Sequence, residues 1–326
     1  MVATSILILS CTFSFQSTDG PITPRVHREA RPVAMAASAP APDPVPDLRV
    51  DVPLALIPVH VTTGLGTSVT NLKKENFRVF EDGVEQSVTQ FASEDAPVSI
   101  GLLFDASGSM RNKIRKSAEA AAAFFRIANA EDEFFLIEFN ERPHLTVPFT
   151  RNAELIYQHI LKTRALGRTS LLDAIHMALT QMKSATHLRK AIVIVSDGGD
   201  NRSRYTEAEV RSAMREADVQ VYAMGIFDPD DQPKRTPEEK HGPKLLADLA
   251  EESGGRNFSI NKLEDLPTVC ERIGTELRNQ YVLGYAPSNA DDHSYRHVKV
   301  IVDAPGMPPL RVHNRQGYYP GPEHVE

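Results

Sequence analysis

The stretch VSIGLLFDASGSM, residues 98–110, determines the fold class expected for this chain. Its first seven residues are apolar or small, which predicts a strand buried on both faces, and the strand runs directly into a loop of small polar residues. A second stretch, AIVIVSDGGDN at residues 191–201, has the same order: an apolar run, an aspartate and glycines. Buried strands that alternate with amphipathic segments are typical of a parallel sheet with helices on both faces.

Outward from these two stretches, the pattern predicts an α/β domain over residues 97–280. We expect a Rossmann-like, doubly wound, mostly parallel six-stranded sheet with strand order 3-2-1-4-5-6. The connection between the second and third strands is too short for a helix, so these two should form an antiparallel hairpin at one edge. The strands are predicted at residues 98–104, 133–139, 145–149, 191–195, 219–226 and 257–260. The helices are predicted at residues 113–128, 153–163, 170–184, 207–217, 244–252 and 263–278. Residues 228–242 contain three prolines and predict a surface loop.

Short alternating stretches flank this domain on both sides, in an N-terminal β segment over residues 48–96 and a C-terminal β segment over residues 281–320. Asp82-Gly83 lies between the stretch at 77–80 and the stretch at 88–91, which is a hairpin signal. Each flank has too few strands to be stable alone. We therefore expect the two flanks to pack together as a small accessory β domain, followed by a tail at residues 321–326.

The N-terminal region predicts export. Residues 1–17 hold an apolar run of the length of a signal peptide, too short to span a bilayer, although no basic residue precedes the run. Residues 18–47 are rich in proline and predict an extended linker. The expected location is the periplasm, the cell surface or the medium, with no transmembrane span. A lipid anchor at Cys11 is the alternative, in a weak resemblance to a lipoprotein cleavage site.

Charge and cysteine content exclude several classes of protein. The 326-residue chain carries a net charge of -7 and no long run of lysine and arginine, so no nucleic-acid partner is expected. Cys11 and Cys270 are its two cysteines, which rules out a disulfide framework. Cys270 shares one helical face with Leu266, Ile273 and Leu277, which indicates a buried structural thiol.

The candidate chemistry lies where the two apolar strands end. In the predicted topology the first and fourth strands are neighbours, and ligands bind beyond their carboxyl ends. Asp105 and Asp197 should therefore face each other there, with Ser107 and Ser109 in the first loop. The segment LGRTS, residues 166–170, can bring Thr169 to the same edge. Two carboxylates and three hydroxyls are hard oxygen donors, which suit Mg²⁺ or Mn²⁺.

This donor set predicts a way of binding a partner. Three neutral ligands leave the ion much of its positive charge, so the carboxylate of an Asp or Glu on a partner protein can fill an open coordination position. Taken singly, Ser107 and Ser109 could be helix caps and the aspartates could stabilise helix starts. Taken together, five oxygen donors in three loops at one sheet edge favour a metal site. Asp200 and Asn201 are expected to complete the loop rather than bind the ion.

The pattern Asp105-x-Ser107-x-Ser109, with Thr169 and Asp197 in later loops, resembles the metal-ion-dependent adhesion site of von Willebrand factor A domains. All five positions match, and the resemblance covers about residues 98–278. It implies a metal-dependent protein-binding or adhesion module. Residues 76–83, 277–285 and 315–319 extend the likeness to the bacterial VWFA-related proteins abundant in acidobacteria.

The predicted binding module is not an enzyme. Two alternative functions remain open. The first is a structural or assembly scaffold without metal-dependent binding. The second is a Mg²⁺-dependent phosphatase of the haloacid dehalogenase type, which also has an Asp after its first strand. That chemistry usually needs a second Asp two residues later, where this chain has Ser107, and no lysine-bearing loop stands out. A serine hydrolase is excluded because Ser107 does not lie in a G-x-S-x-G sequence.

Overall fold

The computed structural model of the protein describes residues 54–93, 95–227, 236–287 and 294–320. The predicted signal peptide with Cys11, the linker and the tail at 321–326 lie outside the described residues. Within the described ranges, no helix has both the length and the apolar composition that a bilayer crossing requires.

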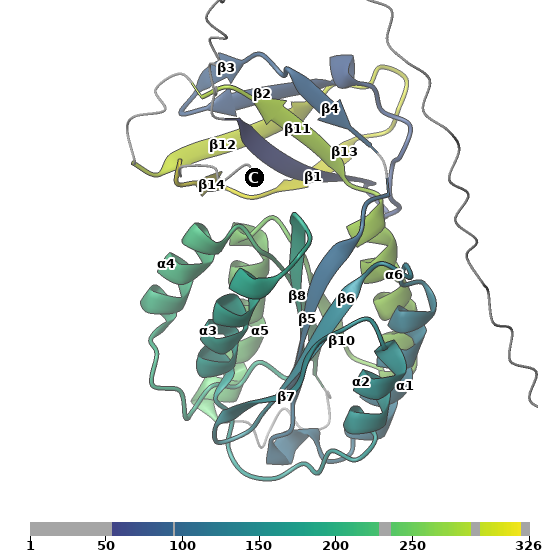
Figure 1. The fold of residues 1–326 in the computed structure, drawn as a ribbon, viewed down its shortest axis with the longest axis vertical. Coiled ribbons are helices and arrows are strands. Elements are labelled where there is room, and N and C mark those ends of the chain that lie inside the picture. Colours follow the sequence, from purple (N-terminus) through teal and green to yellow (C-terminus); the bar gives the residue numbers. More distant parts are fainter. Residues whose placement is uncertain (1–53, 94, 228–235, 288–293, 321–326) are drawn as a thin grey trace, which may run out of the picture. The chain divides into compact units, whose positions relative to one another are not determined.

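A six-stranded sheet forms the centre of the α/β domain (Figure 1). Its order, from edge to edge, is β10 (Asn257–Ile260), β9 (Gln220–Ile226), β8 (Arg189–Ser196), β5 (Val98–Asp105), β6 (Glu133–Phe139) and β7 (Pro143–Thr150). All neighbours are parallel except β6 and β7, which are antiparallel. This confirms the predicted strand order and the edge hairpin. Every residue of β5 is buried, as its continuous apolar sequence requires.

Helices cover both faces of this sheet, and alternate strand residues pack into two separate cores (Figure 1). Leu102 of β5 contributes to one core and Leu103 to the other, because successive side chains of a strand point to opposite faces. The first core is closed by α1 (Ile114–Arg126), α2 (Ala153–Ile160) and α6 (Leu266–Arg278). The second is closed by α3 (Leu171–Gln181), α4 (Glu207–Ala217) and α5 (Pro237–Glu252).

Cys270 lies on the buried face of α6, as its helical spacing predicted. Its Sγ atom is 3.3 Å from the Sδ atom of Met224, and burial raises the pKa of the thiol to about 12. The thiol is therefore a packing group, without the depressed pKa that a reactive cysteine needs.

The prediction of a surface loop over residues 228–242 is wrong for its last part. Residues 228–235 lie outside the described ranges, but α5 begins at Pro237 and contains Pro243. A proline at the first helical position costs no hydrogen bond, because the N–H group there has no partner within the helix. Of the three prolines that indicated a loop, Pro237 therefore marks a helix start.

The segments on either side of the α/β domain form two four-stranded sheets, and each sheet contains strands from both flanks. The first has the order β13 (Leu310–Asn314), β1 (Ala55–Thr63), β11 (Tyr281–Tyr285) and β4 (Gln90–Ala92). The second has the order β14 (Gly317–Tyr318), β12 (Arg296–Val302), β2 (Phe77–Glu81) and β3 (Val84–Gln86). Their inward side chains share one apolar core, which includes Ile57, Val79, Leu283 and Val300.

Asp82-Gly83 forms a hairpin turn, but its partner strand differs from the predicted one. Asp82 has φ 48° and Gly83 has φ 83°, the left-handed pair that a tight two-residue hairpin requires. The turn joins β2 to β3, not to the stretch at 88–91. That stretch instead supplies β4, which pairs with β11 in the other sheet. The turn residues specify a hairpin, whereas pairing across sheets depends on contacts distant in sequence.

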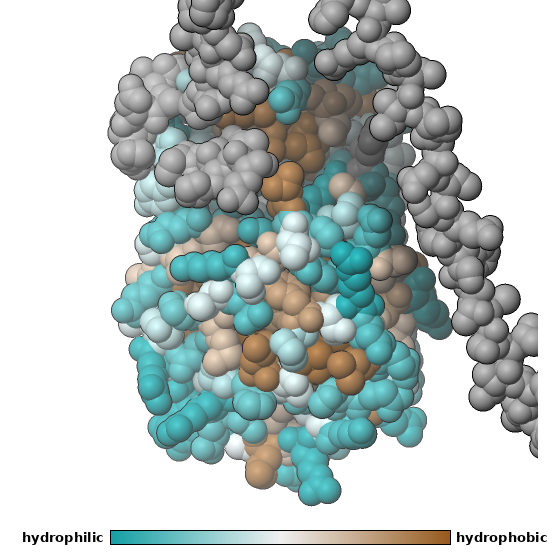
Figure 2. Space-filling view, in the orientation of Figure 1, coloured by the Kyte–Doolittle hydropathy of each residue, from teal (hydrophilic) through white to brown (hydrophobic). Residues whose placement is uncertain are grey.

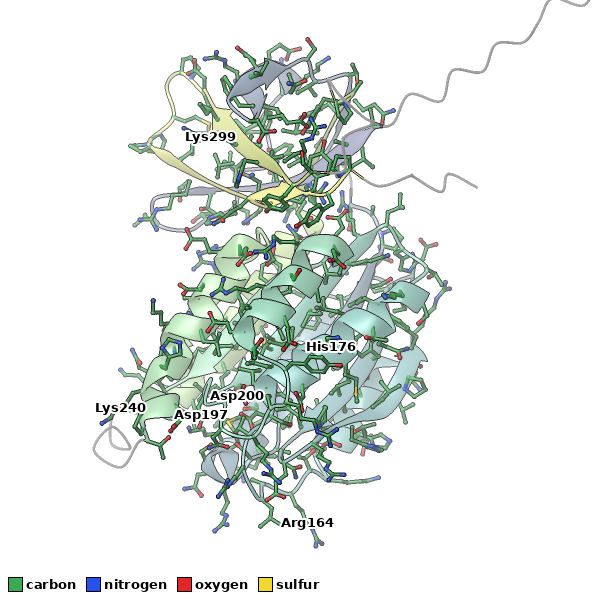
Figure 3. All side chains as sticks on the ribbon, turned by 90° about the vertical axis from the view of Figure 1, so that its left-hand side faces the viewer. Arg164, His176, Asp197, Asp200, Lys240 and Lys299 are labelled. Carbon is green, nitrogen blue, oxygen red and sulfur yellow. The ribbon has the colours of Figure 1, made fainter. Side chains whose placement is uncertain are left out.

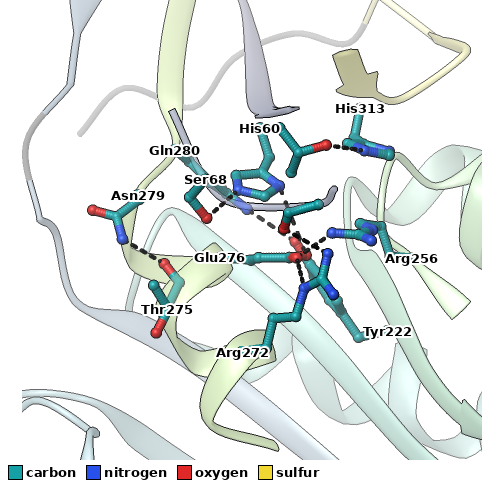
Figure 4. Close-up of polar contacts among 12 residues, drawn as sticks. His60, Ser68, Tyr222, Arg256, Arg272, Thr275, Glu276, Asn279, Gln280 and His313 are labelled. Atoms are coloured by element: carbon teal, nitrogen blue, oxygen red, sulfur yellow. Dashed lines mark hydrogen bonds and ion pairs between the residues drawn. The ribbon is translucent and has the colours of Figure 1, made fainter. Parts of the chain in front are cut away.

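A buried polar cluster joins α6 to the flanking strands (Figure 4). Glu276 of α6 accepts hydrogen bonds from Arg256 and from Nε of Arg272, the latter at 3.2 Å. Arg272 also donates to the carbonyl of Gly66, which follows β1, at 2.5 Å. His60 of β1 lies beside them, with its Nδ1 atom 3.7 Å from Oε2 of Glu276. This cluster holds the last helix of the α/β domain against the first strand of the flanking sheets.

The histidines of this cluster should make the protein sensitive to mild acid. Burial, then nearby His313 and the guanidinium groups of Arg256 and Arg272, lower the pKa of His60 to about 3. Burial and neighbouring arginines lower the pKa of His313 to about 4. An unfolded histidine titrates near pH 6.5, so between about pH 6.5 and about pH 4 the unfolded chain binds more protons. The stabilisation is complete above this window and is lost as the pH falls through it.

We therefore expect the melting temperature to fall between about pH 6.5 and about pH 4, and to fall less steeply in a His60→Gln, His313→Gln variant. His144→Gln, at an exposed position on β7, is the matched control and should keep the slope of the unmodified protein. Calorimetric melting across this range measures the slopes. Equal slopes in the double variant and the control would contradict the assignment.

Candidate functional site

The candidate site lies at the carboxyl ends of β5 and β8, where both predicted aspartates are found. Phe104 pairs with Val195 across these parallel strands, so Asp105 and the residues after Val195 leave the sheet side by side. Asp105 is fully buried and Asp197 is 6% exposed. Figure 3 shows Asp197 and Asp200 together at this end of the domain. The predicted juxtaposition of Asp105 and Asp197 is also visible in their electrostatics, because Asp197 is a cause of the pKa shift of Asp105.

Asp105 is held by the loop that follows it. Its Oδ1 atom accepts a hydrogen bond from the backbone N–H of Ser107 at 2.8 Å, and its Oδ2 atom accepts one from the hydroxyl of Ser196 at 2.5 Å. The hydroxyls of Ser107 and Ser109 are 3.1 Å apart. Burial first, and then the nearby carboxylate of Asp197, raise the pKa of Asp105 to about 7. A cation at this place would favour the ionised form.

Asp197 has one satisfied oxygen and one without a partner. Its Oδ2 atom lies 3.6 Å from Nζ of Lys113, a buried lysine that also donates to the carbonyl of Ile226 at 3.3 Å. Its Oδ1 atom is buried and makes no hydrogen bond. A buried carboxylate oxygen without a donor is costly. The side chain thus has one oxygen beside an ammonium group and one buried oxygen without a hydrogen-bond partner.

Backbone hydrogen bonds join the loop of Thr169 to the other two loops. The N–H of Leu166 donates to the carbonyl of Ala106 at 2.8 Å, and the N–H of Gly108 donates to the carbonyl of Gly167 at 3.0 Å. On the other side, the side chain of Asn201 accepts from the N–H of Thr169 at 3.1 Å. The N–H of Asn201 in turn donates to the carbonyl of Thr169, also at 3.1 Å. The three loops therefore form one connected unit, and Asn201 completes a loop, as predicted.

Gly198 brings α5 into direct contact with the Asp197 loop. Gly198 has φ 79°, and a Cβ atom added there would lie 2.7 Å from the carbonyl carbon of Gly242 in α5. Both positions therefore need glycine for the backbones to approach this closely. A shift of the first turns of α5 would be transmitted directly to the loop that carries Asp197.

The residues present fit a hard divalent cation. The three loops bring together Asp105, Ser107, Ser109, Thr169 and Asp197, and four of these are buried while Ser109 is exposed at the rim. This donor set has only two carboxylates. Accordingly, within the described part of the chain, no three His, Cys, Asp or Glu side chains gather as a metal-binding group. Hydroxyl and carboxylate oxygens suit Mg²⁺ or Mn²⁺ and do not suit zinc or copper. The partnerless oxygen of Asp197 is the feature that calls for a cation. Coordination by these five residues remains a prediction.

Two residues of the site were not predicted from the sequence. Ser196 is the last residue of the apolar strand that precedes Asp197. The sequence therefore indicated only a buried strand position, although its hydroxyl donates to Asp105. Lys113 stands at the start of α1, where a lysine is normally exposed, and only the fold shows that it is buried against Asp197. The sequence analysis considered lysines only as a phosphatase-type loop and did not connect Lys113 with the site.

Comparison with known proteins identifies the domain. Residues 100–199 match the family model of the von Willebrand factor type A domain, a span that runs from β5 to the loop after β8. These residues therefore form a von Willebrand factor type A domain.

Individual relatives are distant. The chain is 23% identical over 167 residues to an uncharacterized protein of Borreliella burgdorferi, a match that covers 47% of this chain and 49% of that protein. Similar solved structures include a von Willebrand factor type A protein from Catenulispora acidiphila, with 12% identity, coverage of 81% of this chain and 73% of that one, and a TM-score of 0.49. Another is BatB from Bacteroides thetaiotaomicron, with 15% identity, coverage of 56% of this chain and 98% of that one, and a TM-score of 0.44. A third is the von Willebrand factor domain of the pilus tip protein Mfa5 from Porphyromonas gingivalis, with 12% identity, coverage of 56% of this chain and 95% of that one, and a TM-score of 0.43.

Isothermal titration with Mg²⁺ tests the site directly. We expect one ion to bind and Asp105→Ala to abolish the binding, because that change removes a buried carboxylate from the donor set. A proton and the cation compete for Asp105, so affinity should rise from pH 6 to pH 8, through its pKa of about 7. Unchanged binding in a folded Asp105→Ala variant would contradict the site.

Lys113→Met should separate the role of the lysine ammonium group from that of the bound Mg²⁺. Removing the ammonium group should strengthen Mg²⁺ binding about several-fold, because a like charge next to the ion is gone. In chelator, the variant should melt at a lower temperature, since the buried carboxylate of Asp197 loses its counter-charge. Lys116→Met, at a surface ion pair on the same helix, is the matched control and should alter neither value. Weaker Mg²⁺ binding in Lys113→Met would instead make the lysine a positioning residue for Asp197.

Proposed function

We propose that this protein is a binding module that captures an acidic residue of a partner protein through a divalent cation, Mg²⁺ or Mn²⁺. Domains of the von Willebrand factor type A class are interaction and adhesion modules, which supports a binding role. The single observation that carries the proposal is the buried, partnerless Oδ1 atom of Asp197 beside the buried carboxylate of Asp105.

The residues of the chain divide the work of such a site. Asp105 and Asp197 would supply its negative charge, and Ser107, Ser109 and Thr169 would supply neutral oxygens. When bound, the cation would offer an open coordination position to a carboxylate from outside. Ser109 is the exposed member of the set, so the partner would approach from its side of the loop. The hydrogen bonds between the three loops keep the donors in place before any ligand arrives, which reduces the cost of ordering them.

A non-enzymatic role is part of this proposal. Lys113 is the one observation that favours a phosphatase of the haloacid dehalogenase type, because such enzymes combine a lysine with their aspartates. Here its ammonium group is committed to Asp197 and to the carbonyl of Ile226, and Ser107 occupies the position where an acid and base is needed. We therefore expect no hydrolysis of p-nitrophenyl phosphate in the presence of Mg²⁺.

Export to the periplasm, the cell surface or the medium completes the proposal and rests on the apolar run within residues 1–17. A lipid anchor at Cys11 would keep the protein at a membrane surface. Mass spectrometry of the protein purified from its natural host would distinguish cleavage, lipidation and an intact leader.

A capture experiment distinguishes metal-dependent binding from a scaffold role. The immobilised protein should retain a partner from periplasmic and membrane extracts in Mg²⁺ and release it in chelator. Ser109→Ala should reduce the capture, because it removes an exposed oxygen donor without disturbing the core. Ser87→Ala, at an exposed serine before β4, is the matched control and should capture normally. A partner retained equally in Mg²⁺ and in chelator would indicate the scaffold.

A further inference from the structure

The loops that form the candidate site also carry a concentration of exposed arginines. Four loops lie at this edge of the sheet: residues 106–112, 140–143, 164–170 and 197–205. They contain six arginines, all exposed: Arg111, Arg142, Arg164, Arg168, Arg202 and Arg204, here called the arginine rim. Figure 3 shows Arg164 at the same end of the domain as Asp197 and Asp200.

The four loops that form the arginine rim contain more guanidinium groups than carboxylates. Apart from the two aspartates of the site, these four loops hold only two carboxylates, Glu141 and Asp200. None of the six guanidinium groups makes an ion pair with a described residue, whereas Arg211, Arg256 and Arg278 elsewhere in the domain are all paired. The whole chain has a net charge of -7. A positive surface on an acidic protein attracts anionic partners to one place and repels them from the rest.

The backbone around the arginine rim is fixed, and an apolar side chain lies within it. Leu166 is 68% exposed although its N–H group is bonded to the carbonyl of Ala106. Arg168 precedes Thr169, and Arg202 follows Asn201, the two residues that are bonded to each other across the site. Leu166 lies between Arg164 and Arg168 in sequence, and protein interfaces are enriched in arginine with an apolar centre.

We propose that the ligand of this surface is an acidic segment of a protein, in which one carboxylate reaches the metal site and its neighbours in sequence contact the arginine rim. This inference rests on the proposed function, because it assumes that the central carboxylate is bound through the cation. Guanidinium groups pair with carboxylates in a bidentate manner, so several flanking acids are recognised better than one. The rim then supplies selectivity for acidic runs over isolated acidic residues.

A polyanionic peptide fits better than a nucleic acid. Single-stranded nucleic acids are bound by stacking bases on exposed aromatic side chains. The only aromatic residue in these four loops is Tyr205, and its ring is already stacked on His176 at 3.8 Å. Leu166 offers an apolar contact to a side chain and no platform for a base.

Fluorescence anisotropy with two labelled peptides tests the arginine rim. One peptide is hexaglutamate, and the other has a single glutamate among five glutamines; both are measured in saturating Mg²⁺ at low salt. Arg164→Gln with Arg168→Gln should weaken hexaglutamate binding about tenfold and leave the single-glutamate peptide within about twofold. Lys74→Gln with Lys299→Gln removes the same charge from exposed positions of the flanking β segments, before β2 and in β12, and should change neither affinity. Hexaglutamate has six carboxylates that can reach the cation, and the other peptide has one. This difference does not affect the test, because the protein variants are compared with each other on the same peptide.

The outcomes separate the arginine rim from the metal site. Hexaglutamate binding that is equal in the two double variants overturns the arginine rim, while its loss in Asp105→Ala would still support the proposed function. Binding that persists in Asp105→Ala or in chelator overturns the inference, since the central carboxylate would then not need the cation. Tighter binding of a twelve-nucleotide oligothymidylate than of hexaglutamate overturns it in favour of nucleic acid. Raising the salt to about 300 mM should reduce the difference between the two double variants, because the rim charges are exposed.

Discussion

Two buried carboxylates at the adjacent ends of parallel strands are the constraint on which this structure depends. The pairing of β5 with β8 brings Asp105 and Asp197 together at a buried place. Like charges in such a place are unfavourable, and the raised pKa of Asp105 expresses that cost. The chain provides hydroxyl and N–H donors for Asp105 and the ammonium group of Lys113 for Asp197, and still leaves one oxygen without a partner. We infer that a bound cation would complete this stabilisation.

The remaining architecture holds this edge in place. The sheet is buried on both faces, so the strand ends cannot move independently of the two helical layers. The contact between Gly198 and Gly242 joins the Asp197 loop to α5, and the cluster around Glu276 joins α6 to β1. Both ends of the domain are thus connected to helices through close or buried contacts. A ligand that moved the Asp197 loop would therefore affect α5 first.

Sequence patterns predicted the α/β domain well because its signals are local. The buried strands are continuous apolar runs, and the helices have clear amphipathic spacing, so strand order and the edge hairpin were predicted correctly. Errors arose where one signal has two meanings. Pro237 indicated a loop but begins α5, and Asp82-Gly83 indicated a hairpin but did not identify its partner strand. A turn sequence specifies a bend in the backbone and not the strand that pairs after it.

For the site, the sequence by itself determined which oxygen donors exist and which strand ends carry them, because an apolar run followed by Asp-x-Ser-x-Ser is a local feature. Only the tertiary structure decided that Lys113 and Ser196 belong to the same site and that Asn201 fastens the Thr169 loop. It also decided that arginines from four separate loops share one surface. The physical reason is that burial and electrostatic interaction depend on distance in space, and residues such as 113 and 197 become neighbours only after the sheet has formed.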